Sequence, residues 1–411
     1  MKISDVYKDV EAAKSRVESL RSKFEKSFDN GDNLRFFSCP GRSEIIGNHT
    51  DHQGGCVIAC SIELDILACV SVRDDRIVRI KSDDYLIELD LSLLEKQTDE
   101  VATSAGLVRG VAAGLAGLGA KICGFDAVFD STVPPGSGLS SSAAFSVLVG
   151  KILSSFAGFE ADYITLAKNA KFAENVYFEK PCGLMDQIAC ACGGMVFIDF
   201  KNAENPAVEQ IECDLKSAGL NLVITNTGGS HADLTDAYAE IPADMRMVAQ
   251  VMGCETLSEC DADEFFNEVG CDDEGDVPEP KVPARAYYRA AHYFDECERV
   301  KSLKKFVKKR DFKEFLRIIN ASGHSSVEYL GNVFVPNNDE QNLAAGLEVS
   351  ARFLKRTGAV RVHGGGFAGT ILAFVPNEIL PKYIKKMNKL FGADAAIVSD
   401  VRDAGVCEIF V

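Results

Sequence analysis

A dense polar segment lies directly before a long apolar one near the start of the chain. The segment "PGRSEIIGNHTDHQGG" begins at Pro40 and carries an Arg, a Glu, an Asn, two His and an Asp among four glycines. The run "CVIACSIELDILACV" follows it at once and predicts a buried strand. Polar side chains beside a buried strand are costly unless hydrogen bonds or a ligand satisfy them. We therefore expect this polar segment, residues 40–55, to line a binding site.

The charge of the chain excludes one large class of partner. Its 411 residues carry a formal net charge of −17, whereas binding to a nucleic-acid backbone needs clustered Lys and Arg. No apolar run reaches the roughly 18 residues of a membrane-spanning helix, and the N-terminus does not resemble a signal peptide. We therefore expect a cytoplasmic protein, a monomer or weak homo-oligomer, that binds neither nucleic acid nor membrane.

Fourteen cysteines are scattered through apolar segments, where a free thiol behaves as a small hydrophobic side chain. Their spacing does not match that of zinc ligands. We predict reduced thiols and no structural metal.

The periodicity of apolar residues predicts an α+β chain with two domains, residues 1–205 and 206–411. Helices are expected within residues 1–30, at 101–118, from Ser140, from near Asp162, at 284–300 and at 311–321. The stretch "DRIVRIKSDDYLIELDLS" alternates around "DD" and predicts a β-hairpin. We expect residues 258–283, which are acidic, to form a solvated excursion on the surface.

A glycine- and serine-rich segment, "PPGSGLSSSAAF", starts at Pro134. Its glycines permit a tight turn, and its serines fall where a helix begins. Helix N-termini carry unpaired N–H groups and a partial positive charge, so they attract phosphate. An ordinary serine cap after a turn explains the pattern equally well.

Two further segments carry candidate residues. In "FAENVYFEKPCGLMDQIACACGG", Asp186 stands among apolar residues and should meet a cation, because a buried carboxylate without a partner is costly. Glu174 is either a metal ligand or a solvated helix charge. In "VHGGGFAGTILAFV", three consecutive glycines let the backbone approach a ligand closely, although such a stretch is often only a turn. Together these segments predict phosphoryl transfer, around Mg²⁺, to a polyhydroxylated acceptor bound by Glu44, His49 and Asp51.

These motifs resemble those of the galactokinases, within the GHMP kinase superfamily. The polar segment is similar to "GRxNLIGEHTDYNGG", and "AENVYFEKPCGLMDQ" is similar to "AEHxFxGxPCGIMDQ". "PPGSGLSSSAAF" and "HGGGFAGTILAFV" resemble the phosphate-binding and C-terminal glycine motifs of the superfamily. The resemblance implies a two-domain GHMP kinase fold, with an N-terminal domain like ribosomal protein S5 domain 2 and a ferredoxin-like C-terminal domain. It also implies transfer of the γ-phosphoryl group of ATP to the anomeric hydroxyl of galactose.

The same resemblance implies roles for individual residues. Asp186 and Arg42 match the catalytic pair, and Ser142 and Glu174 match Mg²⁺ ligands. The sugar-binding residues implied by it are Glu44, Asn48, His49, Asp51, Gly183 and Tyr238. The phosphate-binding residues are Pro135, Gly136, Ser137, Gly138, Leu139, Ser140, Ser141 and Ser142.

Departures from the family pattern leave the sugar open. The family has Asn and then Glu where this chain has Glu44 and Asn48, and His52 and Gln53 replace Tyr and Asn. If Glu44 and Asn48 exchange roles, galactose remains the substrate. If a carboxylate is instead lost near the sugar's O6, the pocket admits galacturonate, and "DHQGG" is similar to plant galacturonokinases. A non-catalytic sugar sensor is a third possibility, but the intact "GLSSSAA" and Asp186 favour an enzyme.

Overall fold

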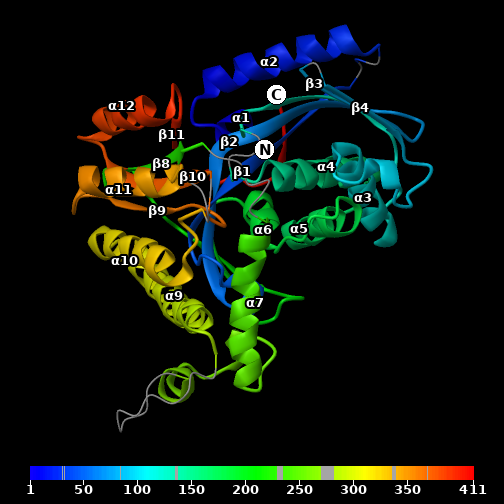
Figure 1. Cartoon of the computed structure of the whole chain (residues 1–411). Helices are drawn as coiled ribbons and strands as arrows, with labels where there is room; N and C mark the ends of the chain where they lie inside the picture. Colours follow the sequence, from blue (N-terminus) through cyan, green and yellow to red (C-terminus); the bar gives the residue numbers. More distant parts are fainter. Residues whose placement is uncertain are drawn as a thin grey trace.

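Two β-sheets organise the chain (Figure 1). The structure is a computed structural model that describes residues 1–29, 31, 33–83, 85–134, 138–228, 235–269, 282–335, 339–367 and 369–411. The larger sheet has eight strands, with the order β12-β1-β2-β5-β3-β4; β6 also pairs with β2, and β7 pairs with β6. Its strands are β1 (Arg35–Ile46), β2 (Cys56–Val72), β3 (Ile77–Ser82), β4 (Tyr85–Asp90), β5 (Phe125–Ser131), β6 (Met195–Asp199), β7 (Ala207–Ile211) and β12 (Cys407–Ile409).

The second sheet has the order β11-β8-β10-β9 and is antiparallel throughout. Its strands are β8 (Leu220–Asn226), β9 (Ala359–Val362), β10 (Thr370–Pro376) and β11 (Ala396–Ser399). Strand β10 alternates its two faces: Leu372 and Phe374 join the core shared with the larger sheet, whereas Ile371, Ala373 and Val375 pack toward α11 (Asn342–Leu354) and α12 (Leu380–Phe391). The two sheets therefore share one continuous core.

Helices cover both faces of the larger sheet (Figure 1). Helix α2 (Val10–Ser27), preceded by the short α1 (Ile3–Val6), packs on one face against β2 and β5. On the other face lie α3 (Ser104–Gly117), α4 (Ser141–Ala157), α5 (Tyr163–Phe172) and α6 (Met185–Cys192). Helices α9 (Ala284–Lys308) and α10 (Phe312–Ser325) lie between the second sheet and the end of β1. Helix α7 (Thr235–Val251) packs along α9.

Most elements expected from the sequence are confirmed. Strands β3 and β4 pair as an antiparallel hairpin, and Asp162 and Asp311 cap the predicted helices at their N-termini. Neither β7 nor α7 is predicted by periodicity. The division at residue 205 stays a prediction, since β7 and β12 both pair within the larger sheet.

In the described part of the expected solvated excursion, residues 258–267 are exposed or half-buried, as expected, with the exception of Phe265. Phe265 directly follows the short α8 (Ala262–Glu264), is fully buried, stacks on Tyr287 and makes a tilted ring contact with Phe294, both on α9. Residues 270–281 lie outside the described residues.

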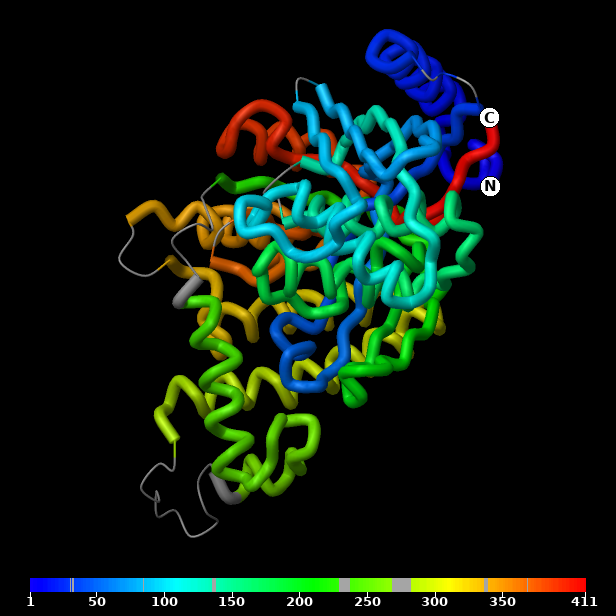
Figure 2. The backbone as a smooth tube through the Cα atoms, turned by 90° about the vertical axis from the view of Figure 1, so that its right-hand side faces the viewer, coloured from blue at the N-terminus to red at the C-terminus, as the bar shows by residue number. Residues whose placement is uncertain are grey.

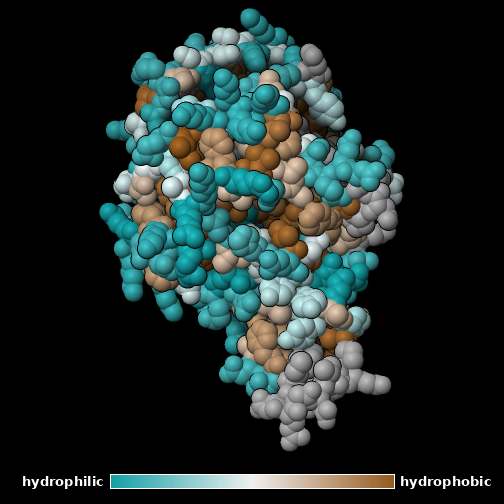
Figure 3. Space-filling model, turned by 60° about the vertical axis from the view of Figure 1, so that its left-hand side comes forward, coloured by the Kyte–Doolittle hydropathy of each residue, from teal (hydrophilic) through white to brown (hydrophobic). Residues whose placement is uncertain are grey.

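The surface agrees with the charged composition. Hydrophilic residues cover most of the face in Figure 3, and hydrophobic residues show between them near the middle. No helix within the described ranges has the length and apolar character required to cross a bilayer.

Candidate functional site

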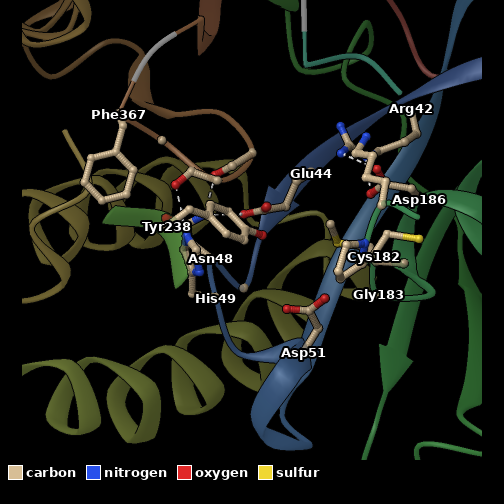
Figure 4. Close-up of a pocket in the computed structure, with 17 residues that line it drawn as sticks. Arg42, Glu44, Asn48, His49, Asp51, Cys182, Gly183, Asp186, Tyr238 and Phe367 are labelled. Carbon is tan, nitrogen blue, oxygen red and sulfur yellow. Dashed lines mark hydrogen bonds and ion pairs between the residues drawn. The ribbon is translucent and has the colours of Figure 1, made fainter. Parts of the chain in front are cut away.

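A pocket of about 450 Å³ lies where the polar segment meets the segment before α6 and the glycine turn 364–366 (Figure 4). Eight residues predicted from the sequence line it: Arg42, Glu44, Asn48, His49, Asp51, Gly183, Asp186 and Tyr238. The sequence-based grouping of these residues is therefore matched by a single cavity. Figure 4 places Arg42 and Asp186 at one end, and Asn48, His49, Tyr238 and Phe367 at the other.

Arg42 and Asp186 form a bidentate ion pair at the first end. Arg42 Nε donates to Asp186 Oδ1 at 2.7 Å, and Nη2 donates to Oδ2 at 2.8 Å. Ser140 Oγ also donates to Asp186, and Arg42 Nη1 donates to the carbonyl oxygen of Gly138 at 2.6 Å. Irregularities in the β1–β2 register, between Pro40 and Arg42 and between Glu44 and Ile46, accompany this arrangement.

The charge state of Asp186 follows from these contacts. Burial opposes the ionised carboxylate, but the charge and hydrogen bonds of Arg42, with that of Ser140, outweigh it and lower the pKa of Asp186. Asp186 is therefore an anion near neutral pH that can accept a hydrogen bond from a hydroxyl in the pocket.

The N-terminus of α4 lies beside this pair. Ser140 is its N-cap residue but adopts φ 59°, and its side chain makes no capping hydrogen bond because it is directed to Asp186. The first N–H groups of α4 are thus left uncapped by Ser140, which favours an anion there over the ordinary serine cap. The side chain of Leu139 is fully buried and packs in the hydrophobic core. Pro135, Gly136 and Ser137 lie outside the described residues.

Ser142 and Glu174 face each other near the start of α4. Ser142 Oγ lies 3.4 Å from Glu174 Oε2, and Gln187 Nε2 donates to Glu174 Oε1 at 3.2 Å. Glu174 sits on a π-helical turn (Ala173–Tyr177), is 2% exposed, and has its pKa raised by burial. The Oε1 atom of Gln187 is buried without a hydrogen-bond partner.

A hydroxyl and a carboxylate are oxygen ligands of the type that Mg²⁺ prefers. Across the described ranges, no group of three or more His, Cys, Asp or Glu forms a metal site. Ser142 Oγ and Glu174 Oε2 are thus two oxygen atoms that could hold such an ion.

Glu44 and Asn48 are both committed to protein partners at the other end. Glu44 Oε1 accepts from Arg361 Nη2 at 2.8 Å, and the Arg361 side chain is fully buried. Asn48 Nδ2 donates to the carbonyl oxygen of Gly364 at 2.6 Å, while its Oδ1 accepts from Asn332 Nδ2 at 2.7 Å. Asn48 thus joins the polar segment to the glycine turn.

His49 is held in an unusual backbone conformation. Its φ of 60° is rare for a residue other than glycine, and such strain concentrates at functional sites. Its Nε2 donates to the carbonyl oxygen of Gly365 at 2.9 Å, and its Nδ1 lies 3.3 Å from Nε2 of His52. Burial and the neighbouring His52 lower the pKa of His49 to about 3, so its imidazole is neutral at pH 7.

Two glycines beside the pocket lie so close to a neighbouring side chain that a Cβ would not fit. A Cβ on Gly365 would lie 2.3 Å from the Tyr238 ring, and a Cβ on Gly183 would lie 2.5 Å from Asp51 Oδ2. Tyr238 itself is half exposed, with its ring centroid 5.0 Å from that of His49. Burial raises the pKa of Asp51.

Sequence reasoning missed several residues in or beside the pocket, three of them charged or aromatic. Lys180 and Phe367 line the pocket, and Arg361, which does not line it, forms an ion pair with Glu44. The only sequence signal for Arg361 is its place between valines in "AVRV", where an unpaired cation is costly.

Comparisons with known proteins agree with this geometry. Residues 106–194 match the family model for the GHMP kinases N terminal domain, and residues 22–72 match the galactokinase galactose-binding signature. The chain is 30% identical to a galactokinase of Lactobacillus helveticus over 385 residues, covering 91% of this chain and 94% of that protein. It is 28% identical to a galactokinase of Bacillus subtilis over 402 residues, covering 95% and 97%.

Solved structures give the same match. The crystal structure of Lactococcus lactis galactokinase complexed with galactose superposes with a TM-score of 0.80 at 25% identity, covering 95% of this chain and 99% of that one. A mevalonate kinase superposes with a TM-score of 0.61 at 15% identity, covering 90% and 99%, which shows the shared fold alone.

Proposed function

The chain belongs to the galactokinase family of GHMP kinases, and from this premise we propose that it transfers the γ-phosphoryl group of ATP to the anomeric hydroxyl of galactose. The products are galactose 1-phosphate and ADP. The observation that carries this proposal is the Arg42–Asp186 pair, which stands at the end of the pocket beside the uncapped N-terminus of α4.

Asp186 is proposed to act on the sugar hydroxyl. The new bond forms between this hydroxyl oxygen and the γ-phosphorus, while the bond from the γ-phosphorus to the bridging oxygen of ADP breaks. Because its pKa is lowered, Asp186 is a weak base toward an unreacted hydroxyl. We assign it the role of orienting the hydroxyl and accepting its proton late, as a loose phosphoryl-transfer transition state permits. Arg42 offsets the negative charge that develops.

The phosphates are assigned to the start of α4. Ser140, Ser141 and Ser142 follow the glycine-rich turn, and the N–H groups there suit an anion. Ser142 and Glu174 are proposed to hold Mg²⁺, and their hydroxyl and carboxylate oxygens fit that ion. When bound, Mg²⁺ would offset charge on the phosphate oxygens.

The far end of the pocket supports galactose over galacturonate. The charge of Glu44 is offset by Arg361, and His49 is neutral. The carbonyl oxygens of Gly364 and Gly365 accept from Asn48 and His49. A sugar carboxylate there would meet carboxylate and carbonyl oxygens, which is unfavourable, whereas neutral hydroxyls can donate to them.

The test is an ADP-release assay with Mg-ATP and a panel of galactose, galacturonate, glucose, arabinose and N-acetylgalactosamine. We expect galactose to have the highest kcat/KM. A galacturonate kcat/KM equal to or above that of galactose would overturn the assignment of the sugar. No ADP release above background with any sugar would overturn the proposed reaction.

A further inference from the structure

Helix α9 contacts the backbone of the polar segment where its conformation is least ordinary. Two buried side chains of this helix, His292 and Glu296, one turn apart, reach consecutive residues of that segment. His292 Nε2 donates to the carbonyl oxygen of Asn48 at 2.9 Å. Glu296 Oε1 accepts from the backbone N–H of Gly47 at 3.1 Å.

The hydrogen-bond chain behind His292 defines which ring nitrogen carries the proton. The carbonyl oxygen of Asn48 can only accept, so Nε2 is the donor. Nδ1 then accepts from Ser325 Oγ at 2.8 Å, and Ser325 Oγ accepts from Arg299 Nη2 at 2.8 Å. Burial lowers the pKa of His292, which agrees with a neutral ring of this one tautomer.

Both carboxylate oxygens of Glu296 accept hydrogen bonds. Ser322 Oγ donates to its Oε1 at 2.5 Å, and Arg299 Nε donates to its Oε2 at 2.6 Å. Burial opposes its charge, yet the charges of Arg299 and Arg361 and the hydrogen bond of Ser322 act against burial, and the pKa of Glu296 falls to about 2. The acceptor offered to Gly47 is therefore a permanent carboxylate held in one orientation.

Gly47 and Asn48 immediately precede His49, whose φ of 60° turns its ring toward Gly365 and Tyr238. A residue keeps a strained conformation of this kind only when hydrogen bonds or packing fix the adjacent backbone, since the strain otherwise relaxes. Within the described residues, the side chains of α9 that hydrogen-bond to the backbone of residues 47–49 are those of His292 and Glu296, whereas Tyr293 donates farther along the segment, to the carbonyl oxygen of Gln53.

We propose that His292 and Glu296 are positioning residues for the sugar: they hold the backbone of Gly47 and Asn48 so that His49 and Asp51 face the pocket. Neither side chain lines the pocket. The inference rests on the proposed function, because it concerns the sugar site of the same reaction.

The experiment compares His292→Leu, which removes the N–H donor at similar volume, with His292→Gln, whose amide can still donate. For His292→Leu we expect the KM for galactose to rise about ten-fold, as the loss of one buried hydrogen bond implies. The KM for ATP should stay within about two-fold, because the hydrogen bonds of the His292 ring go to Asn48 and Ser325 and not to α4. His292→Gln should keep the KM for galactose within about three-fold of the wild type.

Val300→Ala is the matched control, since Val300 is a fully buried residue on the same helix whose apolar side chain can make no hydrogen bond to the polar segment. It should lower Tm and leave the KM for galactose unchanged. If His292→Leu lowers Tm as much as Val300→Ala does, with the KM for galactose unchanged in both, the role is merely structural and the proposal is overturned. Equal KM values for His292→Leu and His292→Gln would also overturn it.

If His292→Leu does not fold, Ser325→Ala replaces it, because that change removes only the hydroxyl that orients the ring. Calorimetric titration with galactose in the absence of ATP should then show weaker binding, and unchanged affinity would refute the proposal. A wild-type protein that phosphorylates no sugar would contradict the proposed function instead, so the two failures are distinguishable.

Discussion

Two ion pairs lie at the pocket, Arg42–Asp186 and Arg361–Glu44, and the pKa of the carboxylate shifts in opposite directions in the two pairs. Arg42 outweighs burial at Asp186 and lowers its pKa, whereas burial prevails over Arg361 at Glu44 and raises the pKa of Glu44. Asp186 also faces the pocket with 31% of its side chain exposed, while Glu44 is 4% exposed. The first carboxylate is therefore available to a ligand as an anion, and the second serves mainly the protein.

The first prediction concerns Asp186→Asn. The variant keeps the shape of the side chain but loses the anion that we propose to orient the hydroxyl and accept its proton. We expect kcat to fall by about three orders of magnitude or more, since the group acts mainly in the transition state. The measurement is ADP release with galactose, with calorimetric titration of galactose as the control for an intact pocket. A kcat within about ten-fold of the wild type, alongside normal sugar binding, would contradict the assigned role.

The second prediction concerns the pH dependence of stability. Burial lowers the pKa of His49 to about 3 and that of His52 to about 4, and it also lowers the pKa of His292 and His363. The folded protein keeps these rings neutral, whereas the unfolded chain takes up protons below about pH 6.5. These histidines therefore reduce the free energy of unfolding as pH falls from about 6.5 to about 4.

Glu44, Asp51 and Glu174, with raised pKa values, act in the opposite sense, so a variant isolates the histidine contribution. His52→Asn should flatten the slope of the unfolding free energy between pH 6.5 and 5 by about one proton, or roughly 1.4 kcal/mol per pH unit. Urea unfolding of both proteins at several pH values provides the measurement. An identical slope in the variant would show that His52 titrates equally in both states.

At the scale of elements, the pocket depends on segments that approach without side chains between them. The segment before α6 reaches the polar segment at Gly183, where Asp51 Oδ2 occupies the space that a Cβ would fill. Flexible ends of side chains can move, but Asp51 is itself a pocket-lining carboxylate. The close approach thus sets where this carboxylate lies.

The third prediction is Gly183→Ala. The new methyl group would lie 2.5 Å from Asp51 Oδ2 and must displace it. We expect the KM for galactose to rise by about ten-fold or more, with a much smaller change in the KM for ATP. Gly194→Ala is a control in the same part of the chain, since a Cβ there meets nothing within 4 Å, although its φ of 69° adds some strain. Equal sugar KM values for Gly183→Ala and the wild type would refute the proposed importance of this contact.

Local patterns predicted the elements well where one face is buried and the ends are marked. The β3–β4 hairpin has strict alternation, and α5 and α10 have Asp162 and Asp311 as caps. Helix α7 was not predicted because Pro242 lies inside it, and a proline within a helical pattern normally indicates the end of a helix. The burial of Phe265 could not be predicted, since its partners on α9 come from a distant part of the sequence.

At the scale of the whole molecule, contacts across long sequence separations complete the pocket. Arg361 of β9 donates to Glu44 and to the carbonyl oxygen of Ile45, both in β1. The positions of the motifs predicted residues that line the pocket, because each motif carries polar or charged side chains suited to binding a ligand. The partners behind them, such as Arg361, His292 and Glu296, were not predictable, because their role exists only after the second sheet and α9 have packed against β1.

The fourth prediction is Arg361→Met. Glu44 would be left buried without its cation, and removing one partner of a buried ion pair costs about 3–5 kcal/mol. We expect a lower midpoint in urea unfolding, and partial recovery in the double variant Glu44→Gln, Arg361→Met, because the uncompensated charge is then gone. A double variant less stable than Arg361→Met alone would contradict this account.

The position of β12 has a consequence for synthesis. Figure 2 shows the two ends of the chain side by side, where β12 pairs with β1 and the Met1 amino group donates to the carbonyl oxygen of Glu408 at 2.8 Å. Strand β1 leaves the ribosome early, yet its edge stays open until residues 407–409 have emerged. Until then the backbone N–H and C=O groups of residues 36–38 lack this partner strand, and an unpaired strand edge is a site where another strand can pair wrongly.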